Sequence, residues 1–95
     1  LDNTMIIYFS DTGEAHHSQR REWPFVVVGG RGHKMKMAGR YLRYPKYTNE
    51  GHKTIGKWYN TILQANGGPS REHFGQLDAK LKDLDLRGPL SELAV

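Results

Sequence analysis

The clearest structural signal in the chain is residues 5–30, MIIYFSDTGEAHHSQRREWPFVVVGG. This stretch contains an apolar run at residues 5–9, a loop rich in Asp, Glu and His, and a second apolar run at residues 25–28. Continuous apolar runs of this length are typical of strands that are buried on both faces, as in parallel sheets. The stretch therefore predicts two buried strands of an α/β protein, with polar groups gathered where the strands end.

One convincing helix follows. Apolar residues at helical spacing predict a helix over residues 52–65 with one face toward a core, and this stripe comprises Ile55, Trp58, Tyr59, Ile62 and Leu63. Thr48 or Asn49 is the expected N-cap. Asn66 and the glycines after it are the expected C-terminal stop.

Two weaker segments complete the chain. Residues 39–44 are expected to form a short strand that Pro45 ends, and residues 76–87 alternate Leu with charge, as in a weak helix or a surface wrap. We therefore expect an α/β fold with two or three strands, one main helix and a loop-rich C-terminal tail. One helix cannot cover both faces of a buried sheet, and the chain begins with Leu1, so we expect residues 1–95 to be a partial domain, the C-terminal part of a larger one.

Composition limits the chemistry. The 95 residues include no cysteine, which excludes disulfides, thiolate metal sites and cysteine nucleophiles. No apolar run is long enough to predict a membrane span, and no signal peptide is recognisable. The formal net charge of +4 weakly favours anionic partners such as a small-molecule substrate.

The loop after the first apolar run carries the candidate metal ligands. Asp11, Glu14, His16 and His17 combine carboxylate and imidazole groups, a donor set that suits zinc, iron or manganese. A divalent ion there would act as a Lewis acid and position an anionic substrate oxygen. The alternative is a solvated turn in which Asp11 caps backbone amides and the imidazoles lie in water.

Other candidates are less specific. The amides of residues 29–32 either cradle an anion or simply form a tight strand exit. A set of basic and aromatic side chains resembles a surface for single-stranded nucleic acid, although such tyrosines more often pack; the set is Arg40, Arg43, Lys46, Tyr41, Tyr44 and Tyr47. We expect no nucleic-acid partner, and no catalytic triad can be assigned.

Several segments, taken in order, resemble a known family. They are LDNTMIIYFSDTGEAHH, WPFVVVGGRG, KMAGRYLRYP, TILQANG, HFGQ and GPLSEL. Their order is similar to that at the C-terminal end of a bacterial family of exported proteins, domain-of-unknown-function family fifteen-fifty-two. This resemblance covers nearly the whole chain and implies a periplasmic or extracellular location.

That family is distantly similar to the alkaline phosphatase and sulfatase superfamily, in which a late strand ends in Ser-Asp-His-Gly and its Asp and His bind metal. Ser10, Asp11 and Gly13 match this pattern, but Thr12 stands where the superfamily has His. By the same resemblance, His16 or His17 matches a later metal-binding His, and Glu14 substitutes as a ligand. The nucleophile and the remaining ligands are then expected in the missing N-terminal part of the same protein.

Two functional hypotheses follow. In the first, the chain is part of an exported alkaline-phosphatase-like protein and contributes an Asp/His loop to a metal-dependent hydrolase site. In the second, which Thr12 motivates, the protein is a non-enzymatic binding or scaffold protein that keeps the fold without a working metal site.

Overall fold

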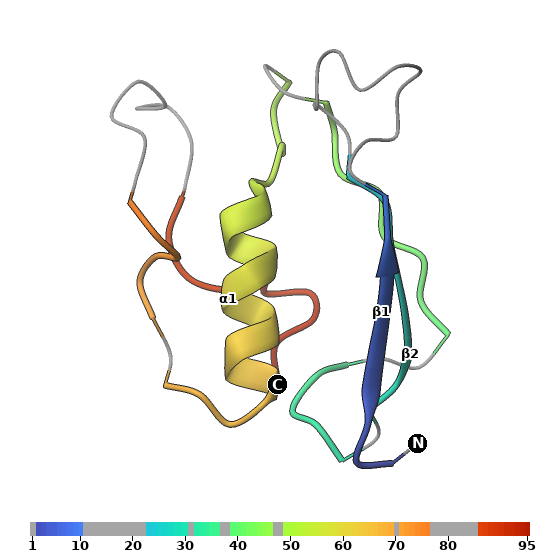
Figure 1. The fold of residues 1–95 in the computed structure, drawn as a ribbon. Helices are drawn as coiled ribbons and strands as arrows, with labels where there is room; N and C mark the ends of the chain where they lie inside the picture. Colours follow the sequence, from blue (N-terminus) through green and yellow to red (C-terminus); the bar gives the residue numbers. More distant parts are fainter. Residues whose placement is uncertain are drawn as a thin grey trace.

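A computed structural model shows a small α/β arrangement of two strands and one helix, and it describes residues 2–10, 23–30, 32–36, 39–46, 49–69, 71–76 and 86–95. The elements are β1 (Met5–Phe9), β2 (Phe25–Gly29) and α1 (Ile55–Ala65). Figure 1 shows α1 lying to one side of the two strands. The expected α/β class and the single main helix are confirmed for the part of the chain that the structure describes.

The two strands form an antiparallel pair, so the expectation of a parallel-type sheet was wrong. Met5 lies opposite Gly29, Ile7 opposite Val27, and Phe9 opposite Phe25. Strands that follow each other in the chain can pair directly in this way, because an antiparallel connection needs no crossover helix.

The strands are also not buried on both faces, which corrects the second expectation. Burial alternates along β2, and along β1 as far as Tyr8, after which Phe9 is also exposed. The inner face, turned toward α1, carries Met5, Ile7, Phe25 and Val27. The outer face is exposed and consists of Ile6, Tyr8, Val26 and Val28. Successive side chains of a strand point to opposite faces, so one covering helix buries only every second residue of an apolar run.

Helix α1 begins three residues later than the spacing predicted. Its N-cap is Thr54, with an extended backbone and no side-chain capping hydrogen bond, so the expected cap at Thr48 or Asn49 was wrong. The predicted stop is confirmed. Asn66 is the C-cap, Gly67 takes a φ of 83°, and the Gly68 amide donates to the Leu63 carbonyl at 2.9 Å. A left-handed glycine after the last turn satisfies carbonyls that the helix itself leaves open.

The core lies between α1, the inner face of the sheet and the C-terminal tail. Its buried apolar side chains are Met35, Trp58, Ala65 and Leu90. The tail is held by a bridge between Met35 and Ala94. Residues 39–46 form no strand, so the optional third strand was wrong, and most of the expected weak helix at residues 76–87 lies outside the described residues.

Candidate functional site

Two paired phenylalanines lie at the end of the strands where the candidate metal loop begins and ends. Phe9 and Phe25 face each other at the end of the strand pair, with ring centroids 5.7 Å apart. Phe25 also packs on Trp58 of α1, at 4.9 Å between centroids. Ser10 directly follows Phe9, and Pro24 directly precedes Phe25. Both ends of the connection therefore lie next to this row of aromatic rings, which reaches the core at Trp58.

The candidate ligands themselves lie outside the described residues. Asp11, Glu14, His16 and His17 all belong to residues 11–22, as does Thr12. Elsewhere in the described part of the chain, no group of three or more His, Asp or Glu side chains is arranged to hold a metal ion. The metal site therefore stays a prediction that concerns this one connection.

The described amides of the glycine-rich segment after β2 favour a strand exit over an anion cradle, and Arg31 lies outside the described residues. The Gly30 amide donates to the Thr4 carbonyl at 2.8 Å, and the Gly32 amide donates to the Asp2 carbonyl at the same distance. Gly30 has a φ of 78°, a conformation that glycine adopts without steric cost. Both amides are thus used within the protein and do not point at a ligand.

The tyrosine- and arginine-containing segment does not form the predicted stacking surface as a unit. Tyr41 is 86% exposed, but Tyr44 packs against the core and donates its hydroxyl to the Glu92 carboxylate at 3.1 Å. Arg40 donates to the Glu92 backbone carbonyl. Tyr44 and Arg40 therefore join this segment to the tail, which favours the packing interpretation; Tyr47 lies outside the described residues.

The environment of Tyr44 also changes its acidity. Burial, together with the neighbouring Glu92 carboxylate that accepts its hydrogen bond, raises the pKa of Tyr44 to about 12. Both effects disfavour the phenolate, since it would have to lose solvent and lie beside a second negative charge. The hydroxyl is therefore a structural donor at neutral pH.

Sequence reasoning missed one buried charged residue. Lys57 lies in the first turn of α1 beside the apolar stripe, yet only 4% of its surface is exposed. Helical spacing alone gives no signal for this, because the tail that covers Lys57 comes from residues 87–91, thirty positions later in the chain.

Comparison with known proteins adds no relative. No family model matches the chain, and no curated protein or solved structure matches it either. Within the described residues, no helix is both long enough and apolar enough to cross a lipid bilayer.

Proposed function

We propose that residues 11–22 bind a divalent metal ion and contribute part of a metal-dependent hydrolase site in a larger, exported, alkaline-phosphatase-like protein. The observation that supports this is the strand register. Because β1 and β2 pair antiparallel and close at Phe9 and Phe25, all four candidate ligands belong to one connection at one end of the sheet. Carboxylate and imidazole groups confined to a short connection are a donor set that suits zinc, iron or manganese.

The proposed chemistry follows from the donor set. A divalent ion held by Asp11 and one of the two histidines would polarise an ester oxygen and bind the negative charge of an anionic substrate. The remaining ligands and the nucleophile are proposed to come from the rest of the protein. This connection would then supply half of the site.

Metal titration of the 95-residue chain tests the metal site directly. We expect isothermal titration with Zn²⁺ or Mn²⁺ to show one site, and Asp11→Ala or His17→Ala to weaken it by about tenfold or more. Glu50→Ala, an exposed carboxylate outside the loop, is the matched control and should leave affinity unchanged. No binding to the unaltered chain, or equal losses in all three variants, would refute the proposal.

A second candidate function is favoured by the outer face of the sheet. Ile6, Tyr8, Val26 and Val28 form an apolar surface without a charge, and Tyr8 is 75% exposed. A sheet face of this composition ordinarily packs against another layer. The chain would then be a binding or scaffold unit whose outer face is covered by an apolar helical layer of a larger α/β protein.

Two neighbouring valines on opposite faces test this candidate. Val26→Thr keeps a β-branched side chain on the outer face, so we expect it to reduce self-association of the 95-residue chain without lowering its stability. Val27→Thr, on the inner face, should instead lower the melting temperature. Light scattering that shows a monomer at all concentrations, before any substitution, would contradict the scaffold interpretation.

A further inference from the structure

The backbone of β1 has one edge that pairs with β2 and one edge that faces away from it. The Gly30 amide donates to the Thr4 carbonyl, and the register of the strand pair sets these two residues directly opposite each other. Hydrogen-bonded and non-hydrogen-bonded pairs alternate along an antiparallel ladder, so every second residue of β1 directs its amide and carbonyl away from β2. These residues are Met5, Ile7 and Phe9.

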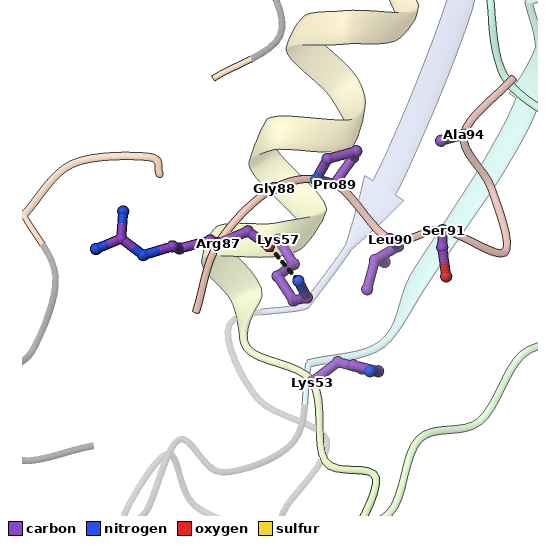
Figure 2. A pocket seen from close by; sticks show the side chains of 8 residues that line it. All are labelled: Lys53, Lys57, Arg87, Gly88, Pro89, Leu90, Ser91 and Ala94. Carbon is purple, nitrogen blue, oxygen red and sulfur yellow. Dashed lines mark hydrogen bonds between the residues drawn. The ribbon is translucent and has the colours of Figure 1, made fainter. Parts of the chain in front are cut away.

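This free edge of β1 makes no backbone hydrogen bond within the part of the chain that the structure describes. The backbone bonds outside the strand pair all join other residues. The C-terminal tail packs elsewhere, since Figure 2 shows its 87–91 segment over the first turn of α1, where the Lys57 ammonium donates to the Arg87 carbonyl. A strand edge with unpaired amides and carbonyls is a template on which a further strand can pair.

The free edge of β2 is less regular than that of β1. Pro24 directly precedes β2 and has no amide to donate. At the other end of β2, Gly29 has a φ of 81°, which is outside the extended conformation. β1 contains neither proline nor glycine, so its edge is the one suited to pairing along its whole length.

β1 also lacks the features by which proteins protect an edge strand. Its sequence, MIIYF, contains no charged residue and no proline. Phe9 lies opposite Phe25, with ring centroids 5.7 Å apart, yet its side chain is 54% exposed. A neighbour on the β1 side of the sheet would cover this ring, because Phe25 already packs on it from the β2 side.

We propose that the β1 edge pairs antiparallel with β1 of a second copy of this chain, about a two-fold axis at Ile7. Ile7 then lies opposite Ile7 of the second copy, and Met5 lies opposite Phe9. Residues paired in this way exchange both of their edge hydrogen bonds. Each copy contributes a two-stranded sheet, so the dimer has one continuous sheet in the order β2-β1-β1-β2, with both copies of α1 on the same face.

The side chains of β1 complement themselves in this pairing. Met5 meets Phe9, which sets a thioether against an aromatic ring and covers the exposed phenylalanine. On the outer face Ile6 lies opposite Tyr8, at a non-hydrogen-bonded position where the Cα atoms are about 4.5 Å apart. Pairs of an aromatic and a β-branched side chain stabilise a sheet at this spacing, and no like charges meet. A symmetric contact between copies needs such self-complementarity.

Amide hydrogen exchange, followed by NMR over a range of concentrations of the 95-residue chain, tests the proposal without any substitution. We expect exchange at Met5, Ile7 and Phe9 to slow by about tenfold or more as the dimer forms, because these amides gain acceptors. The Val27 amide, on the free edge of β2, is the matched control and should not slow in this way. Exchange at Ile7 that is independent of concentration, or slowing at Val27 in its place, would overturn the proposal.

Charged variants separate edge pairing from packing of the outer face. Ile6→Lys combined with Tyr8→Lys sets like charges opposite each other across the edge, so we expect a monomer in analytical ultracentrifugation. Val26→Lys combined with Val28→Lys adds the same charge to the same face on β2. This variant should remain a dimer, because outer-face packing then acts only between dimers. A monomeric β2 variant would overturn the edge pairing and leave the scaffold candidate, which depends on the outer face, standing.

A variant of opposite charge completes the test. Ile6→Glu combined with Tyr8→Glu should also be monomeric alone, whereas an equimolar mixture with the Ile6→Lys and Tyr8→Lys chain should form a heterodimer, because opposite charges then face each other. Circular dichroism checks that both variants are folded. Folded variants that stay monomeric when mixed would overturn the proposed register, and the exchange experiment on the unaltered chain decides the question if either variant fails to fold.

Discussion

The Thr61 hydroxyl connects the helix to the tail. Thr61 is 2% exposed; its hydroxyl donates to the Lys57 carbonyl at 2.7 Å and accepts from the Leu90 amide at 2.8 Å. The first bond is a local one within α1, and the second reaches across 29 positions of the chain. The Thr61 hydroxyl thereby provides an acceptor for the buried Leu90 amide, which lies outside any helix or strand.

Thr61→Val removes this hydroxyl while keeping the shape of the side chain. We expect it to lower the free energy of unfolding by about 1–3 kcal/mol, because the buried Leu90 amide loses its acceptor. Thr61→Ser keeps the hydroxyl and should cost less. Urea denaturation followed by circular dichroism would measure both, and a valine variant as stable as the original chain would show that the hydrogen bond contributes nothing.

The raised pKa of Tyr44 predicts a pH dependence. Its folded pKa of about 12 exceeds the ordinary value of 10.0, so the neutral hydroxyl contributes to stability below pH 10, and this contribution is lost as the pH rises through about 12. We expect the unaltered chain to lose more stability than Tyr44→Phe between these pH values. Thermal denaturation at several alkaline pH values measures this, and parallel curves for the two proteins would contradict it.

The two ends of α1 respond differently to a single added methyl group. Gly56 lies in the first turn, where a new Cβ would meet only the Thr54 hydroxyl at 3.7 Å. Gly68 lies just beyond the C-terminal end, where a new Cβ would be 2.7 Å from the Leu63 carbonyl oxygen. The first contact is ordinary packing, whereas the second requires the backbone to move.

Alanine at each glycine therefore has an opposite effect. Gly56→Ala should stabilise the chain by roughly 0.5–1 kcal/mol, because alanine has the higher helix propensity. Gly68→Ala should destabilise it by about 1–3 kcal/mol, because the chain must rearrange around Leu63. Melting temperatures measured side by side would test the pair, and a neutral Gly68 variant would mean that the helix end relaxes freely.

The sheet is covered by α1 on one side only (Figure 1). Its outer face is apolar and exposed. A two-stranded sheet has two edges with unpaired backbone groups, which favour association. The metal half-site that we propose would lack, in this chain alone, the groups that position a substrate. The exposed apolar face, the open sheet edges and the incomplete metal site are all expected if the chain acts within a larger protein, as we propose.

The isolated 95-residue chain is therefore expected to be catalytically inactive. It should not hydrolyse p-nitrophenyl phosphate or p-nitrophenyl sulfate above the buffer rate, with or without Zn²⁺ or Mn²⁺, because half a site does not orient a substrate. Absorbance at the wavelength of the nitrophenolate product measures this. Turnover that Asp11→Ala abolishes, in this chain alone, would contradict the half-site proposal.

Local patterns identified the two strands and the helix that the structure describes, but they also predicted a strand at residues 39–44 that does not form. The apolar runs marked β1 and β2, the helical spacing from Ile55 to Leu63 marked α1, and Asn66 with Gly67 marked its end. These signals are local because they depend on a residue and its near neighbours. The start of α1 was misplaced, since His52 bonds the Pro45 carbonyl at 2.9 Å and Thr54 takes an extended conformation instead of a helical one.

Only the folded structure shows which elements contact one another. An apolar run such as residues 25–28 fits a strand buried on one face or on both, and only the antiparallel pairing with α1 on one side leaves Val26 and Val28 exposed. Lys57 is buried because the 87–91 segment covers it. Composition and periodicity thus located the strands and the helix. Long-range packing decided which apolar face stays open and that the tail covers Lys57, because contacts between distant residues leave no periodic trace along the chain.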